Sequence, residues 1–277
     1  VITRKNLDEL NRYNILILPD VLRLSSEESH AIKNYISKGG SVYASKFTLN
    51  SELAKAFGIS YLEETKHKVT YIAPTLNGKK LLPEISSRYP LTIMDSQIIT
   101  EPKQKDGVMA TMVLPYTDPE DSKFVSIHTN PPGIHTKHPA LIYRELNKGR
   151  ILWSSATIET QSIDSLKHRS ILLHVFRQLS KSSFSFEATA PECVEITMFH
   201  EKTEKRYLIN LLNLQSEVGS PNIPIENIRL KVKLDSKVKE IKTLPEGKKL
   251  LFKQVQEYAE IKIPKLLNFK MIALDYE

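Results

Sequence analysis

The chain has 277 residues, of which 40% are hydrophobic and 26% charged, and these proportions are those of an ordinary globular protein. Its 9 glycines and 15 prolines exclude a collagen-like chain and a long coiled coil, and no apolar run approaches the ~20 residues that cross a bilayer. The net charge of +7 is dispersed along the chain, so we expect neither a nucleic-acid nor a membrane partner. The densest basic stretch, residues 231–242, alternates Lys with Val, Leu and Ile, which predicts a pair of strands with a solvated lysine face.

The first part of the chain alternates strands and helices. Residues 14–18 (NILIL) form a nearly continuous apolar run, which predicts a parallel strand with both faces covered. Ser25 and Glu28 have the spacing of a capping box, so a helix is expected after them, and Gly39 provides its left-handed end. Residues 41–45 (SVYAS) predict the next buried strand. A strand, a helix and a strand joined by short links predict a right-handed parallel crossover.

A short helix at residues 52–57 is followed by a region of short β-rich runs whose links contain Pro and Gly. The expected strands are residues 68–72, 91–99, 108–114, 124–127, 140–145 and 150–154. We interpret this region as a β-rich insertion that returns to the parallel sheet at its last strand. The clearest helix follows at residues 167–179, with an apolar stripe of Ile171, Leu172, Val175, Phe176 and Leu179.

After Ser180 the pattern contains strands only, and Ser182-Ser183 is the natural domain boundary. Strands with period-two alternation are expected at residues 194–200, 206–214, 228–234, 237–243, 249–255, 258–263 and 271–274. This spacing is typical of a small antiparallel sandwich. The predicted fold is therefore an α/β domain at residues 1–182, followed by an all-β antiparallel sandwich at residues 183–277.

Few residues are candidates for catalysis or metal binding. Cys193, the only cysteine, opens a predicted strand and is expected to pack in the core or at its rim; there is no serine-hydrolase elbow and no phosphate-binding glycine loop. His128, His135 and His138 fall in a Pro-rich loop that also contains Pro131. The three imidazoles raise a metal hypothesis, but no carboxylate pattern or HExxH helix supports it.

The sequence favours a loop rim that contacts a neighbouring subunit or the entrance of an active site, formed by His128, Pro131, His135 and His138. We expect no catalytic residue, no metal site and no cofactor in this chain. Trp153 is expected to pack in the core more than to serve as a platform for sugar stacking.

Residues 13–45 (YNILILPDVLRLSSEESHAIKNYISKGGSVYAS) resemble the β-galactosidase trimerisation domain, which follows the catalytic barrel in family 42 and related glycoside hydrolases. The segments HTNPPG (128–133) and PALIYRELNKGRILWSSATIE (139–159) are similar to the closing part of that domain. There the family shows a Gly-Lys-Gly-Arg pattern, which Lys148, Gly149 and Arg150 match, while Asn147 stands at the first glycine. The tail from Phe184, with residues 191–215, looks like the sandwich that ends many of these enzymes.

This resemblance implies a flavodoxin-like domain similar to class I glutamine amidotransferases, without their nucleophile, because Lys46 and Phe47 follow the strand before the expected elbow. It also implies that a first strand and helix are missing before Val1 and that the chain is the C-terminal part of a longer enzyme. The expected role is assembly with the enzyme's own catalytic barrel and within a homo-oligomer.

Two alternatives stay open. The first is a stand-alone amidotransferase-like hydrolase. The second is a carbohydrate-binding protein that stacks sugar on Tyr207, Phe252, Tyr258 or Phe269 of the sandwich, although strand aromatics more often belong to a core. The sequence does not decide the compartment; we favour the cytoplasm over secretion.

Overall fold

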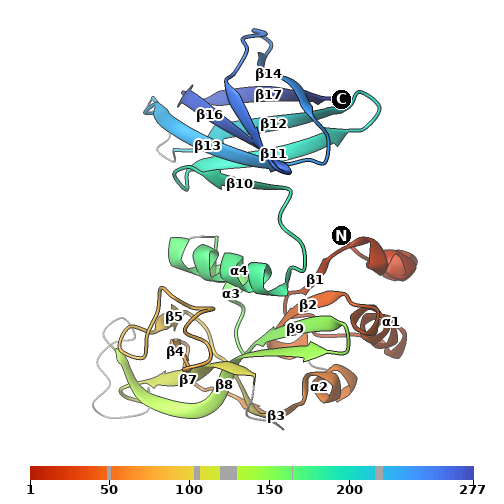
Figure 1. Ribbon diagram of the computed structural model, residues 1–277. Coiled ribbons are helices and arrows are strands. Elements are labelled where there is room, and N and C mark those ends of the chain that lie inside the picture. The colour runs from red at the N-terminus through yellow and green to blue at the C-terminus, as the bar shows by residue number, and fades with distance from the viewer. Residues whose placement is uncertain (49–50, 103–106, 119–129, 164, 216–220) are drawn as a thin grey trace. The chain divides into compact units, whose positions relative to one another are not determined.

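The structure, a computed structural model, describes residues 1–48, 51–102, 107–118, 130–163, 165–215 and 221–277 (Figure 1). The chain divides into two compact units, Val1–Lys181 and Ser182–Glu277, whereas the sequence placed the boundary after residue 182. The fold is mixed α/β and mostly β, with 45% strand and 19% helix. No helix among the described residues is long and apolar enough to cross a membrane.

A seven-stranded sheet forms the framework of the first unit. Its strands are β1 (Ile15–Leu18), β2 (Ser41–Ser45), β4 (Thr70–Pro74), β5 (Leu91–Ile93), β7 (Val108–Pro115), β8 (Pro132–Leu146) and β9 (Gly149–Ser154). They lie in the order β1-β2-β9-β8-β7-β4-β5. The first three run parallel, as the crossover pattern predicts, and each further strand pairs antiparallel with its neighbour.

The predicted insertion is part of this sheet. Its strands β8, β7, β4 and β5 continue the sheet beyond β9, while β3 (Ile59–Glu64) and β6 (Ile98–Pro102) form a separate antiparallel pair. The single strand expected at residues 91–99 is in fact two, β5 and β6, which belong to different sheets. Between them the Ser96 amide donates to its neighbour Asp95 at 2.8 Å, a local hydrogen bond that competes with strand pairing. The strand predicted at residues 124–127 lies outside the described residues, and β3 was not predicted.

The helical segments that the structure describes in the first unit are η1 (Arg4–Arg12), α1 (Ser26–Ser37), η2 (Lys46–Thr48), α2 (Ser51–Phe57), α3 (Ile158–Gln161) and α4 (Leu166–Leu179). Three of them, α1, α2 and α4, were predicted from the sequence, whereas η1, η2 and α3 were not. At α1 the predicted capping box is confirmed: the Glu28 amide donates to Ser25 Oγ at 3.2 Å, and the Ser25 amide donates to Glu28 Oε2 at 2.7 Å. Gly39 ends the helix with a φ of 111°.

Alternating residues of the parallel strands fill two separate cores. Tyr43 and Leu152 face a core that contains Ile171, Val175 and Leu179 of α4. Their chain neighbours, among them Val42 and Trp153, face the opposite core, which α1 and α2 complete. Figure 1 shows α4 and α2 on opposite sides of the sheet. The strand at residues 41–45 is therefore buried on both faces, as predicted.

His168 is a buried polar residue of α4. Its Nε2 lies 2.8 Å from the Thr92 carbonyl oxygen and its Nδ1 lies 2.6 Å from Ser165 Oγ. Because a carbonyl only accepts, Nε2 carries the proton and Nδ1 accepts from the serine hydroxyl. Burial lowers the pKa of His168 below its ordinary value of 6.5.

This depressed pKa predicts a pH dependence of stability. The folded state favours neutral His168, so its contribution is present above pH 6.5 and declines as the pH falls below that value. We expect the free energy of unfolding, followed by Trp153 fluorescence in urea, to decrease between pH 7.5 and pH 5.5. His168→Asn should flatten this part of the profile. An unchanged slope in the variant would contradict the assignment.

The second unit consists of two four-stranded antiparallel sheets that share one core. One sheet has the order β10-β13-β16-β15 and contains β10 (Phe186–Thr189), β13 (Ile225–Lys233), β16 (Tyr258–Leu266) and β15 (Phe252–Val255). The other has the order β11-β12-β17-β14 and contains β11 (Val194–Glu201), β12 (Arg206–Asn213), β17 (Phe269–Tyr276) and β14 (Val238–Leu244). Buried residues of both sheets, such as Ile209, Leu230, Ile261 and Leu274, form one cluster.

The lysine-rich stretch at residues 231–242 is divided between these sheets. It lies on β13 and β14, which do not pair with each other, so the predicted strand pair is wrong. The alternation is confirmed on β13, where Leu230 and Val232 are buried, whereas on β14 a bulge between Val238 and Glu240 interrupts it. Two consecutive strands with alternating apolar residues have the same sequence pattern whether they pair within one sheet or lie in two facing sheets, so the pattern could not decide between these arrangements.

Candidate functional site

Two non-glycine residues adopt left-handed backbone where adjacent parallel strands end. Asp20 follows β1 and Lys46 follows β2, each with a φ of 44°. Such a conformation costs an L-residue roughly 1 kcal/mol or more, so surrounding contacts must hold it. The Phe47 amide donates to Asp20 Oδ1 at 2.9 Å, and the Asp20 amide donates to Ser45 Oγ at 3.0 Å. The two strand ends are thereby tied together.

Lys46 is almost completely buried and lies among acidic and hydroxyl groups. Its Nζ donates to Asp95 Oδ2 at 2.8 Å and to Ser96 Oγ at 3.3 Å, and Glu64 Oε1 lies 3.3 Å away. Ser96 also donates to Glu64. Burial acts to lower the pKa of Lys46, but the hydrogen bonds and charges of Asp95 and Glu64 outweigh it and raise the pKa above its usual value.

Glu159, at the start of α3, completes the cluster from the other side of β2. Its carboxylate accepts from Tyr43 Oη at 2.6 Å and from Ser45 Oγ at 2.5 Å. Burial, followed by the charge of Glu159, raises the pKa of Tyr43 well above its ordinary value. We call Tyr43, Ser45, Lys46, Glu64, Asp95 and Glu159 the strand-end cluster.

The strand-end cluster combines the ion pairs of Lys46 with the hydrogen bonds of Glu159, and it has little capacity for covalent chemistry. An amine attacks only in its neutral form, whereas two carboxylates keep Lys46 protonated. Ser45 donates to Glu159, and no histidine is among the partners found for it. Among the described residues, no three His, Cys, Asp or Glu side chains converge in a way that would hold a metal ion.

Lys46→Met should destabilise the first unit. The change leaves Asp95 and Glu64 close together without their cation, and we expect a loss of about 2 kcal/mol in the free energy of unfolding, reduced by the partial exposure of both carboxylates. Urea unfolding followed by the fluorescence of Trp153, the single tryptophan, measures it. Lys55→Met, which removes an exposed lysine of α2, is the matched control and should change stability by less than ~0.5 kcal/mol. Equal losses in the two variants would contradict the expectation.

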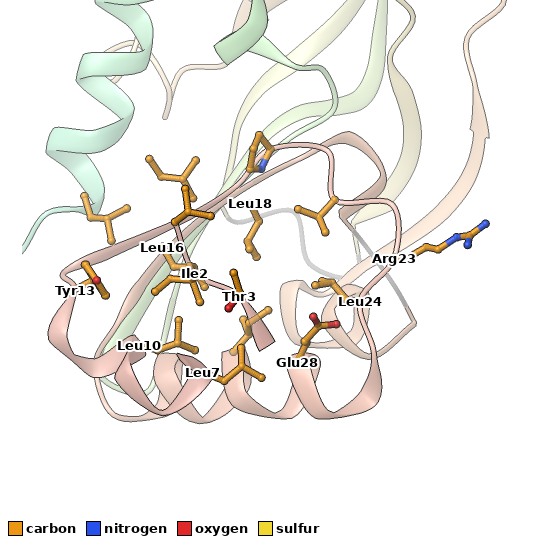
Figure 2. Close-up of a pocket in the computed structure, with 16 residues that line it drawn as sticks. Ile2, Thr3, Leu7, Leu10, Tyr13, Leu16, Leu18, Arg23, Leu24 and Glu28 are labelled. Carbon is orange, nitrogen blue, oxygen red and sulfur yellow. The ribbon is translucent and has the colours of Figure 1, made fainter. Parts of the chain in front are cut away.

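A groove of about 550 Å³ lies between η1, β1 and α1 (Figure 2). Figure 2 shows Ile2, Leu7, Leu10 and Leu16 converging on it, whereas Arg23 extends away. Its size is within the range of ligand sites, and its lining is mainly aliphatic. At its edge Glu28 binds Arg4 Nε at 3.0 Å in addition to its role as a cap.

The groove exists because β1 lies at the edge of the sheet. The apolar run at residues 14–18 predicts a strand covered on both faces, but Ile17 is 45% exposed, so this prediction is wrong for β1. Within the described sheet β1 pairs with β2 alone. Leu22, in the segment after the strand, is also exposed. Apolar side chains next to a free strand edge are typical of a surface that another chain segment covers.

Three of the four residues proposed from the sequence lie on or directly before β8. His128 lies outside the described residues. Pro131 directly precedes β8, and His135 and His138 lie on β8 itself, so the predicted loop is wrong for these two histidines. His135 pairs with Val113 of β7 and is exposed. The prolines at 131, 132 and 139 suggested a loop, but Pro132 and Pro139 lie within β8, in a region whose register with β7 is irregular.

The remaining candidates also have definite positions. Trp153 is fully buried and donates from Nε1 to the Lys46 carbonyl at 3.2 Å, which confirms core packing. Cys193 is half-buried against the sandwich core. Tyr207 stacks on His200, with ring centroids 4.2 Å apart. None of the four aromatic candidates is fully buried: Tyr207 and Tyr258 are half-buried, and Phe252 and Phe269 are exposed.

Sequence reasoning missed the strand-end cluster. One signal was present: the buried strands β2 and β9 end in Ser45 and Ser154, and the polar residues Lys46 and Ser155 follow them directly. The carboxyl ends of neighbouring parallel strands meet at one edge of a sheet. That signal could have suggested Lys46, but not its partners.

Comparison with solved structures shows which fold the chain shares. It matches α-L-fucosidase isoenzyme 2 from Paenibacillus thiaminolyticus with a TM-score of 0.74 at 19% identity, over 96% of this chain and 41% of the fucosidase. It matches Gan42B, a GH42 β-galactosidase from G. stearothermophilus, with a TM-score of 0.59 at 14% identity, over 96% of this chain and 32% of that enzyme. A β-galactosidase from Rahnella sp. R3 gives a TM-score of 0.59 at 14% identity, over 97% and 33% of the two chains.

These similarities are structural. No protein-family profile and no curated protein sequence matches the chain. The chain spans about two-fifths of the fucosidase and one-third of the β-galactosidases, and at these identities the comparison establishes a shared fold. The fold is that of a domain pair found within glycoside hydrolases.

Proposed function

We propose that the chain is a non-catalytic assembly region of a glycoside hydrolase, with the catalytic barrel outside these 277 residues. In this proposal the first unit is the trimerisation domain, with a flavodoxin-like fold related to class I glutamine amidotransferases. The second unit is the C-terminal sandwich. Galactosides or fucosides are the substrates of the whole enzyme, since the structural neighbours are named for these sugars.

One observation carries the proposal. The matches run through almost the entire chain, at 96% or 97%, yet more than half of each neighbouring enzyme lies outside the matched region. The strand-end cluster supports the non-catalytic part. It lies where an amidotransferase-like fold would have its nucleophile, and its lysine is occupied by Asp95 and Glu64.

The assembly role has a definite surface. We assign the groove and the free edge of β1 to contact with a neighbouring copy of the chain, because such a contact would cover Ile17, Leu22 and the free backbone groups of β1. We assign Pro131, His135 and His138, with His128, to the rim that faces a neighbouring subunit or the active-site entrance of the barrel. The exposure of His135 on β8 supports this assignment.

Two measurements test the proposal. The purified chain should not hydrolyse 4-nitrophenyl α-L-fucoside or 4-nitrophenyl β-D-galactoside above the buffer rate, and turnover of either would overturn the non-catalytic role. Light scattering after size exclusion should give a multiple of 31.6 kDa. Ile17→Asp should shift the mass toward the monomer, whereas Leu76→Asp, at an exposed leucine after β4, should not. A monomer at all concentrations would overturn the assembly role.

A second candidate function is carbohydrate binding by the sandwich. It is favoured by the exposure of Phe252 and Phe269. If these strand aromatics served only to pack the core of the sandwich, they would be buried.

A further inference from the structure

The sandwich has a hollow of about 520 Å³ on the sheet formed by β13, β16 and β15. Four cations line it, namely Arg229, Lys231, Lys253 and Lys262, and Glu260 is the one carboxylate among its lining residues. Glu260 is already occupied, since its Oε1 lies 2.9 Å from Lys231 Nζ. Among the described residues no ion pair is found for the other three cations, although the charges of Lys253 and Arg229 also act on Glu260.

The strand register places two of these cations face to face. Arg229 of β13 is the direct partner of Lys262 of β16, and both side chains are exposed. In the next row of residues on the same face, the side-chain charges alternate in sign across the three strands, because Glu260 lies between Lys231 and Lys253. Like charges directly opposite each other destabilise a sheet, with Cβ atoms about 5 Å apart. The Arg229–Lys262 pair is therefore an unfavourable arrangement for folding that an anion between the two side chains would relieve.

An apolar side chain borders the same hollow. Leu251 is 90% exposed and lines the hollow beside the cations. Phe252 pairs with Ile261, which is buried in the core, so its ring lies on the opposite face of β15 from Lys253. An exposed aliphatic side chain at the edge of a charged hollow suits the C–H face of a sugar ring, while the cations suit its acidic substituent. A nucleic acid would require a longer basic stripe, and Glu260 lies in the middle of this one.

We propose that this hollow binds an acidic glycan, with the carboxylate or sulfate held between Arg229 and Lys262 and the adjoining sugar ring packed on Leu251. The choice of an anion as the ligand rests on the facing positions of Arg229 and Lys262 and on the cations that line the hollow. The choice of a carbohydrate over other anions rests on the proposed function. Lys253 contacts the next acidic unit along the glycan. The surface thus gives a glycoside hydrolase a means of holding a charged polymer away from its catalytic barrel.

Isothermal titration of the chain tests this proposal. The probes are tetragalacturonic acid, a sulfated galactan tetrasaccharide, neutral galactotetraose and a short single-stranded DNA. We expect binding of one or both acidic sugars, weakening as ionic strength rises, and little binding of the neutral one. The carboxylated and sulfated probes distinguish the two sources of negative charge.

Matched variants locate the site. Arg229→Gln and Lys262→Gln should each weaken binding about tenfold, as expected for the loss of one charged hydrogen-bond donor. Lys239→Gln, an exposed lysine of the other sheet, has the same effect on net charge and should leave affinity unchanged. Leu251→Ser should weaken the acidic sugars and leave any binding of DNA unaffected. The double variant R229Q/K262Q should keep or raise the melting temperature, because it removes the facing like charges.

Each contrary result is informative. Absence of binding to both acidic sugars, or an equal loss in Lys239→Gln, would overturn the site. Binding of DNA as tight as that of the sugars, with no effect of Leu251→Ser, would replace the glycan with a general polyanion. Equal binding of the neutral tetrasaccharide would overturn the role of the cations. None of these results depends on whether the chain hydrolyses a glycoside, so failure of the anion site can be distinguished from failure of the proposed function.

Discussion

Replacing Trp153 with alanine is expected to lower the free energy of unfolding of the first unit by about 3–5 kcal/mol. The side chain is fully buried on β9, where it lies beside Ala44 of β2 and Ile142 of β8 in the strand register. Its removal leaves a cavity in the core that α1 and α2 complete. It also leaves the Lys46 carbonyl without the Nε1 donor at 3.2 Å, at the left-handed turn that holds the strand-end cluster.

Urea unfolding followed by far-UV circular dichroism measures the effect, because the variant has no tryptophan to report it. Trp153→Phe is the matched control. It keeps most of the ring volume and removes the N–H donor, so a loss of about 1–2 kcal/mol is expected. Amide exchange in the sandwich strands should not change, since Trp153 belongs to the first unit. A loss below ~1 kcal/mol in the alanine variant would show that the site collapses without a cavity.

Gly149→Ala should be about as damaging, for a different reason. A Cβ atom at this position would lie 2.3 Å from the Ile36 carbonyl oxygen and 2.6 Å from the Gly40 carbonyl oxygen. Both are backbone atoms at the end of α1, so neither can rotate away, and either the helix or β9 must shift. Overpacking of this kind costs about 1–3 kcal/mol, and a backbone clash belongs at the upper end of that range.

Trp153 fluorescence in urea measures this loss directly, because the tryptophan lies in the same strand. Gly149 does not have a positive φ, so the expected cost comes from the close contact and not from the backbone conformation. Lys148→Ala, at the exposed neighbouring position, is the control and should stay within ~0.5 kcal/mol of the unchanged chain. Wild-type stability in Gly149→Ala would mean that α1 is free to move.

Gly149 also explains the motif at residues 147–150. Asn147, which stands where the related pattern has a glycine, adopts a φ of 55° and so uses the left-handed region that asparagine tolerates. Lys148 is exposed, and Gly149 allows the close approach of β9 to α1. The resemblance was therefore built on residues with structural roles, which is why it indicated a fold and not a reaction.

Local signals in the sequence predicted much of the first unit. Ser25 and Glu28 placed the start of α1, Gly39 placed its end, and the apolar run at residues 41–45 placed a strand buried on both faces. Each of these predictions depends on residues within about one helical turn or on one alternating run. The same kind of signal predicted seven of the eight sandwich strands, and missed β10.

Contacts between distant residues were beyond such signals. Lys46 and Asp95 are 49 positions apart, and Ser45 and Glu159 are 114 positions apart. The facing of Arg229 and Lys262 depends on a register between β13 and β16 that a shift of one residue would abolish. The exposure of Ile17 depends on where β1 lies in the sheet, which an apolar run does not specify.

The sequence by itself determined where most helices and strands form, which of their faces are apolar, and that the chain passes from an α/β half to an all-β half. The tertiary structure decided which strand edge stays free, which carboxylates reach Lys46 and which cations face each other on the sandwich. The physical reason is that capping and periodicity act between near neighbours in the chain, whereas sheet order and register follow from the packing of the whole unit.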